Sequence, residues 1–135
     1  MTPEERETLL AVMERIVPAD DFPGATDAGA IDYAEWVNRQ PWFQSVYPRF
    51  AAGLGLLDSL ALGLWGRPFP RCRAEEQDVV LQRLQAIPHP AVQRFFGMVV
   101  KMTLAGFLCS PDYGGNRGRV GWSYIGFHAP SWEMT

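Results

Sequence analysis

The chain has 135 residues and a net charge of −3, with 47% hydrophobic and 20% charged residues. This is the composition of a globular protein with one core, so we expect a single domain over residues 1–135. The 12 Lys and Arg residues are scattered along the chain instead of forming a stripe, which gives no electrostatic reason to expect nucleic acid as a partner.

The N-terminal part predicts a short helix followed by a loop. Thr2, Pro3 and Glu5 have the pattern of a capping box at the start of a helix. The helix gives way to residues 18–29, a run of turn formers that contains Phe22. Because a large apolar side chain needs a surface to pack on, we expect this loop to be ordered.

Two helices with apolar stripes should follow. Residues 30–37 have helical spacing and stop before Pro41, and residues 48–65 carry a continuous apolar stripe that predicts a central helix. Glycine lowers helix propensity, so glycines retained in this stripe indicate that another helix approaches closely there. The glycines concerned are Gly53, Gly55 and Gly63.

The rest of the chain predicts two more helices and a loop. Residues 74–87 alternate apolar with charged and amide side chains, as a surface helix does, whereas residues 91–109 are apolar nearly all round and should form the hydrophobic centre. After residue 110, glycines and aromatic residues without helical spacing indicate a structured loop. No strand pattern is long enough for a sheet, so we predict an all-α fold of about five helices around one core.

Targeting signals are missing from the printed sequence. The first 20 residues have neither a basic region nor an uninterrupted apolar region, so we expect no signal peptide and a cytoplasmic protein. The most apolar segment, Phe95 to Cys109, is shorter than the ~20 residues that cross a bilayer, and it carries Lys101. We therefore predict a buried core helix and no membrane span.

Few residues have a spacing that indicates chemistry. Gly114 and Gly115 lie in a glycine-rich run without the strand, lysine and helix of a phosphate-binding loop. His89 and His128 lack a second ligand at helical spacing, and Cys72 and Cys109 form no C-x-x-C pair, so we expect no metal site and two free thiols.

Asp20 and Asp21 are adjacent carboxylates that allow two interpretations. In an enclosed pocket such a pair can split its pKa values and act as acid and base. Aspartates after a helix-ending proline are more often turn and capping groups, which is the interpretation we favour.

The aromatic residues of the C-terminal segment also allow two roles. Trp122, Tyr124, Phe127 and Trp132 either fold back onto the helices or contact another protein. The chain has 5 tryptophans, and tryptophan is enriched at binding hot spots, so an interface is the sharper hypothesis.

Three segments resemble the gluconate 2-dehydrogenase subunit 3 family, the small subunits of FAD-dependent sugar and alcohol dehydrogenases. The resemblance runs from Leu9 to Phe127 and matches in motif order as well as content. The segments are Ile16-Val17-Pro18-Ala19-Asp20-Asp21 with the following Pro23-Gly24-Ala25 and Ala28-Gly29, Pro111-Asp112-Tyr113-Gly114-Gly115-Asn116, and Gly121-Trp122-Ser123-Tyr124-Ile125-Gly126-Phe127.

The resemblance implies a non-catalytic subunit that binds, stabilises and helps mature a large flavoprotein of the glucose-methanol-choline (GMC) oxidoreductase type. FAD belongs to that partner, and no cofactor, metal or catalytic residue is implied for this chain. A cytochrome subunit that accepts electrons is a further implied partner. Family members also carry a twin-arginine leader, which the printed sequence lacks, so the periplasm is the alternative location if a leader was removed.

The residues within the family motifs and the C-terminal aromatic residues are the predicted partner interface. They are Asp20, Asp21, Phe22, Tyr113, Gly114, Gly115, Asn116, Trp122, Tyr124, Phe127 and Trp132. Two other functions stay open: a stand-alone chaperone or binding module that releases its client, and a small self-sufficient enzyme using Asp20, Tyr113 or His128.

Overall fold

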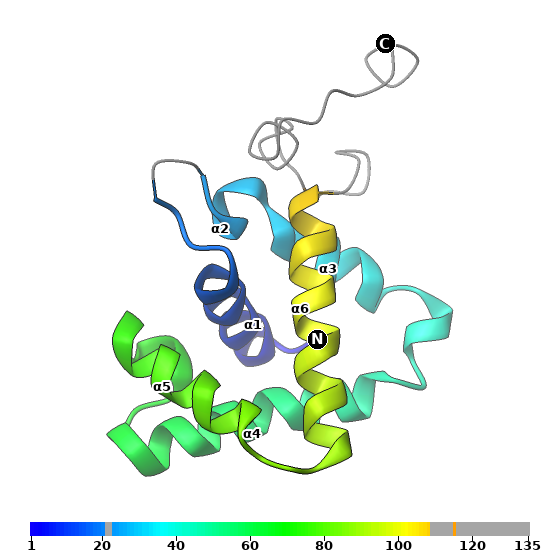
Figure 1. Cartoon of the computed structure of the whole chain (residues 1–135). Coiled ribbons are helices and arrows are strands. Elements are labelled where there is room, and N and C mark those ends of the chain that lie inside the picture. Colours follow the sequence, from blue (N-terminus) through cyan, green and yellow to red (C-terminus); the bar gives the residue numbers. More distant parts are fainter. Residues whose placement is uncertain (21–22, 109–114, 116–135) are drawn as a thin grey trace.

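The computed structural model describes residues 1–20, 23–108 and 115. Within these ranges the chain forms six α-helices and two short 3₁₀-helices, with no strand, which confirms the all-α prediction (Figure 1). In chain order they are α1 (Pro3–Ile16), α2 (Ala25–Ala28), α3 (Ala30–Asn38), η1 (Pro41–Phe43), α4 (Tyr47–Trp65), η2 (Phe69–Arg71), α5 (Ala74–Gln85) and α6 (Pro90–Leu108).

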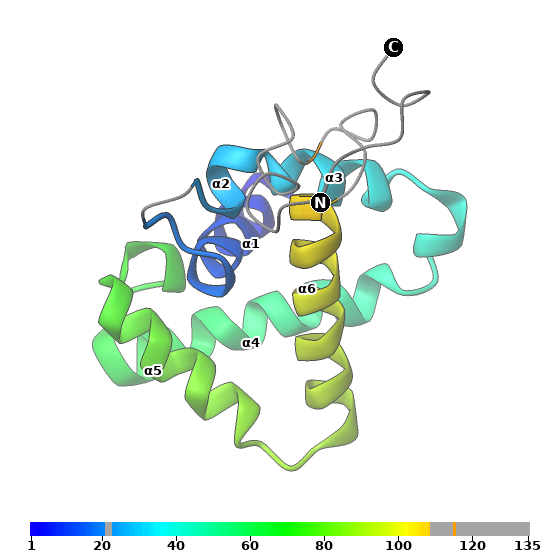
Figure 2. The same ribbon diagram turned by 45° about the horizontal axis from the view of Figure 1, so that its top comes forward.

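Helix α6 runs through the middle of the described structure (Figures 1 and 2). It contacts each of the other α-helices, α1 to α5. Helices α1 and α5 lie on one side of it, and the connection from α3 to α4, which contains η1, lies on the other in both views. All the α-helices contribute to one apolar core, whose largest members include Leu9, Met13, Phe50, Leu54, Leu57, Phe69, Val80, Leu84, Phe95 and Val99.

The capping box predicted at the start of α1 is confirmed. The Glu5 backbone N–H donates to the Thr2 hydroxyl at 3.1 Å, and the Thr2 N–H donates to the Glu5 carboxylate at 2.8 Å. The same carboxylate accepts a hydrogen bond from the hydroxyl of Tyr47 at the start of α4. One side chain thus caps α1 and joins it to α4.

Of the three glycines in α4, only Gly53 meets another helix. A Cβ placed there would lie 2.1 Å from the ring of Phe95 on α6. At Gly55 and Gly63 nothing lies within 4 Å, so the predicted close approach is wrong at these two positions. Helix α6 crosses α4 rather than running beside it, so it contacts only part of the stripe (Figure 2).

The predicted loop after α1 contains a helix that was not predicted, the one-turn helix α2. The Gly24 N–H donates to the Asp27 carboxylate at 3.1 Å, so a residue typical of turns here caps a helix. Gly24 is also required by space, because its Cβ would lie 2.5 to 2.8 Å from backbone atoms of residues 17–19. Gly29, with φ of +71°, then turns the chain into α3.

Helix α6 is less buried than predicted. Only 33% of its most apolar 18-residue window is buried by the rest of the chain. By length and composition alone, the helix could also cross a membrane. Its inner face includes Phe95 and Val99, while Leu104 is 42% exposed. The contacts with all the other α-helices are those of a core helix, and its exposed positions include Arg94 and Lys101 as well as Leu104.

Candidate docking surface

Two of the predicted interface residues lie in the described part of the chain. Asp20 is exposed and Gly115 is buried. Asp21, Phe22, Tyr113, Gly114, Asn116, Trp122, Tyr124, Phe127 and Trp132 lie outside the described residues, so their roles stay predictions.

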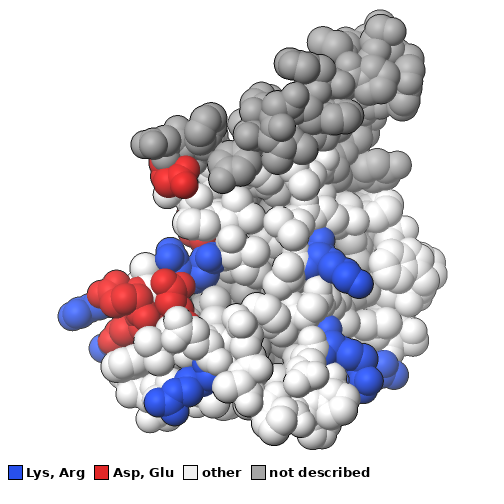
Figure 3. All heavy atoms as spheres, in the orientation of Figure 1, with Lys and Arg blue, Asp and Glu red and all other residues white. Residues whose placement is uncertain are grey.

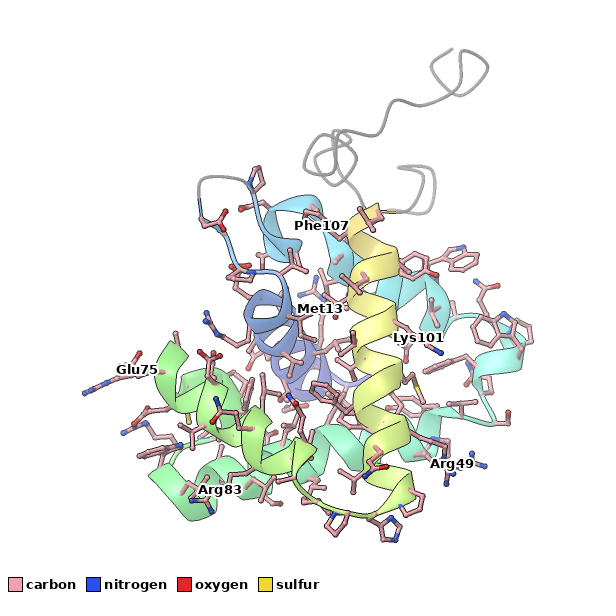
Figure 4. The ribbon with its side chains drawn as sticks, viewed as in Figure 1. Met13, Arg49, Glu75, Arg83, Lys101 and Phe107 are labelled. Carbon is pink, nitrogen blue, oxygen red and sulfur yellow. The ribbon has the colours of Figure 1, made fainter. Side chains whose placement is uncertain are left out.

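Asp20 lies close to the end of α6. A hollow of about 210 Å³ is lined by Ile16, Val17, Pro18, Asp20, Leu104, Phe107 and Leu108. The described part of the first family motif therefore lies beside the C-terminal end of α6. In the sequence, the second motif follows shortly after this end of the helix. Figure 4 labels Phe107 at this end of α6.

A larger apolar groove opens between α3, η1 and α6. It has a volume of about 270 Å³, and we call it the Trp42 groove. Its walls are Tyr33, Val37, Trp42, Phe43, Val46, Met98, Lys101, Met102 and Ala105.

The local sequence explains why Trp42 stands at the surface. In η1, Phe43 is 2% exposed and packs edge-on against Phe50, with ring centroids 5.5 Å apart. The adjacent Trp42 is 61% exposed and meets Phe43 edge-on at 5.9 Å. Because Phe43 anchors the turn and Pro41 fixes its start, Trp42 is held outside the core on a supported backbone.

A further apolar surface lies nearer the N-terminus of α6 and shares no lining residue with the Trp42 groove. Ala91, Met98 and Ala105 are spaced seven residues apart, which places them along one face of the helix. Beside the first of them lies a second apolar hollow of about 200 Å³. Its walls are Arg49, Ala52, Gly53, Leu56, Ala91, Val92 and Phe95.

Charge around these two hollows is of one sign. Arg49 and Lys101 are the charged residues that line them. Helix α6 adds Arg94 but has no Asp or Glu, and neither does the stretch 36–57. On the right-hand side of the view, Figure 3 shows blue without red, and Figure 4 labels Arg49 and Lys101 on this side.

Carboxylates gather instead over α1 and α5, where they form ion pairs. Arg15 pairs with Asp78 at 2.9 Å, and Arg67 pairs with Glu76 at 2.6 Å. Hydrogen bonds from the Arg73 backbone N–H and from Arg67 lower the pKa of Glu76. Among the described residues, Arg49, Arg94 and Lys101 form no ion pair of this kind.

Groups with reactive potential are used structurally in the described ranges. Burial raises the pKa of the Cys72 thiol and keeps it protonated at neutral pH. The His89 Nδ1 accepts the Ala91 backbone N–H at 3.1 Å, which supports the start of α6. The described residues hold no group of three His, Cys, Asp or Glu side chains placed for a metal ion.

Trp42 is not among the predicted interface residues. Its signal was a tryptophan directly after Pro41, in a connection between two helices. The sequence pattern instead favoured the aromatic residues of the C-terminal segment as the interface.

The described part of the chain is a small all-α body with an open apolar groove on its surface. The family model for gluconate 2-dehydrogenase subunit 3 matches residues 3–130. The chain therefore belongs to the gluconate 2-dehydrogenase subunit 3 family, as the three motifs predicted. Comparisons with curated proteins and with solved structures gave no match.

Proposed function

We propose that this chain is an accessory subunit that binds, stabilises and helps mature a large FAD-dependent sugar or polyol dehydrogenase or oxidase of the GMC type. The family match over residues 3–130 carries the proposal, because the family is named for a subunit of a dehydrogenase. FAD and the catalytic groups belong to the large subunit, and this chain supplies a binding surface.

The exposed apolar groove supports a binding role. Trp42 is 61% exposed and borders an open apolar groove, and contiguous exposed apolar surfaces are typical of protein interaction sites. Tryptophans in such positions are typical anchors of protein interfaces. A rigid helical body that presents this anchor can bind a folded partner with little loss of conformational entropy.

The resemblance alone supports two further parts of the proposal, the electron acceptor and the alternative location. A cytochrome subunit is the proposed electron acceptor of the complex. The proposed location is the cytoplasm, with the periplasm as the alternative for a chain cut from a precursor with a twin-arginine leader.

The maturation role is tested by producing the large subunit with and without this chain. The large subunit is first identified by mass from a complex that the tagged chain retains in its native host. We expect coproduction to raise the soluble yield of the large subunit and its FAD content per polypeptide. Equal yield and equal FAD content without the chain would contradict the maturation role.

The same preparations separate the other functions. A chaperone would bind the large subunit during refolding and release it once FAD is bound. A self-sufficient enzyme would turn over substrate as the purified chain alone. A permanent flavoprotein complex with no turnover by the free chain supports the accessory subunit.

A further inference from the structure

Building on the proposed function, we propose that the Trp42 groove and the second hollow near the N-terminus of α6 bind a carboxylate-bearing apolar segment of the large flavoprotein subunit. Apolar side chains of that segment fill the groove beside Trp42. Its Asp and Glu side chains pair with Arg49, Arg94 and Lys101.

The groove offers an apolar anchor site. With a volume of about 270 Å³, it has room for a large apolar side chain against Trp42. Met98 and Met102 form its α6 wall, and methionine side chains adapt to the shape of an incoming group. The opposite wall is fixed by the buried Phe43, so little order has to be gained on binding.

The cations around the groove select the charge of the segment. Arg94 and Lys101 are seven residues apart and leave α6 on the same side, and Arg49 approaches from α4. With no carboxylate among the residues that line either hollow, a basic segment would meet only repulsion. An acidic segment gains from every one of these cations.

Two other occupants fit this surface less well. A second copy of the chain would bring the same cations face to face across a two-fold axis. A membrane surface would be kept out of the concave part of the groove, because η1 and α3 form one of its walls. The charge and the shape therefore favour a segment of a different protein.

The test compares retention of the flavoprotein by tagged variants of the full chain. The variants are Trp42→Ala and the double variant Arg94→Glu with Lys101→Glu, and the control is Arg83→Glu on α5, which lies on the other side of the view from Arg49 and Lys101 (Figure 4). All these positions are exposed, so thermal unfolding should stay close to that of the wild type. We expect each groove variant to retain at least about tenfold less flavoprotein, while the control retains the wild-type amount. If both groove variants retain the wild-type amount of flavoprotein, the groove is not the docking site. The proposed function would be unaffected by this result.

A second arm needs no flavoprotein. Its probes are two labelled amphipathic helical peptides with the same Leu and Trp residues, one carrying Glu and the other Lys, titrated by fluorescence anisotropy. We expect the wild type to prefer the Glu peptide, with an affinity that falls as salt rises, and the double variant to prefer the Lys peptide. Equal binding of the two peptides, or no binding of either, would contradict the proposal that the groove binds an acidic apolar segment.

The remaining outcomes are distinguishable. A groove-dependent dimer of the chain in light scattering, or groove-dependent binding to anionic phospholipid vesicles, would replace the proposed partner by a second copy or a membrane. The wild-type chain could bind the Glu peptide selectively and yet retain no flavoprotein from the host. This result would contradict the proposed function, while the groove would remain a binding site for an acidic apolar segment.

Discussion

Gly53 of α4 and Phe95 of α6 are in contact without any space for a side chain between them. A Cβ on Gly53 would lie 2.1 Å from one ring atom of Phe95 and 2.3 Å from another, at the base of the ring. Phe95 is itself held by Phe50, with ring centroids 6.2 Å apart, and is nearly fully buried. The crossing point of α4 and α6 therefore requires glycine.

Gly53→Ala should destabilise the protein by about 1–3 kcal/mol, since Phe95 cannot leave its position and the helices have to separate. The measurement is urea unfolding followed by circular dichroism. Gly55→Ala is the matched control on the same helix, where nothing lies within 4 Å, and it should be neutral or stabilising by up to about 1 kcal/mol. Shifts of equal size and sign in the two variants would contradict the crossing geometry.

Asp58→Ala should destabilise the protein by about 2 kcal/mol. The Asp58 carboxylate accepts the Thr8 hydroxyl at 3.1 Å and the Phe69 backbone N–H at 3.0 Å, so it joins α1, α4 and η2. Removing it leaves a buried hydroxyl and a backbone donor without this acceptor. The neighbouring exposed Ser59→Ala should change the free energy of unfolding by less than about 0.5 kcal/mol. A neutral Asp58→Ala would mean that the carboxylate does not hold these elements together.

Tyr47→Phe should destabilise the protein by roughly 1 kcal/mol near neutral pH, with a loss that depends on pH. Burial raises the pKa of Glu5, but hydrogen bonds from Tyr47 and from the Thr2 N–H outweigh it, so the net pKa is lowered. The hydrogen bond to Glu5 raises the pKa of Tyr47. The wild type is compared with the variant by thermal unfolding across the pH range.

The two shifts set the window of this effect. A lowered Glu5 pKa gives stability that is present above about pH 4.3, its unfolded value, and is lost as the pH falls through the folded pKa. A raised Tyr47 pKa gives stability that is present below about pH 10 and is lost as the pH rises through the folded value. The difference between wild type and variant should shrink at both ends; a constant difference into strong acid would contradict the bond.

The Cys72 thiol should react slowly with a thiol reagent at neutral pH in the folded protein. It is buried, and burial raises its pKa, so little thiolate is present and access is limited. The rate is measured in a Cys109→Ser background, so that one thiol is followed, and should rise by orders of magnitude in denaturant. Equal rates in the two conditions would place Cys72 at the surface.

The sequence predicted the helices well where local signals act alone. Thr2 and Glu5 marked the start of α1, and the apolar stripes gave α3, α4, α5 and α6 within a few residues. The one-turn helix α2 was missed because Asp27 is typical of a turn as well as of a cap. Which of two such roles applies depends on the space around Gly24, a tertiary property.

The candidate docking surface was harder to predict from the sequence than the helices were. An apolar pattern around α6 predicts burial but cannot say whether this chain or a partner covers the outer face. The exposure of Trp42 follows from the packing of Phe43 against Phe50, which joins residues of different elements. From the sequence, the tryptophans of the C-terminal segment were the predicted interface residues. In the described structure, the exposed tryptophan that lines an apolar groove is Trp42.

The most direct test of the accessory-subunit role is the visible absorbance spectrum of the complex isolated from the native host on the tagged chain, together with the mass of the polypeptide retained. The prediction is a yellow complex with a flavin spectrum and one large polypeptide in a fixed ratio to this chain. A colourless chain that elutes alone as a monomer would contradict it.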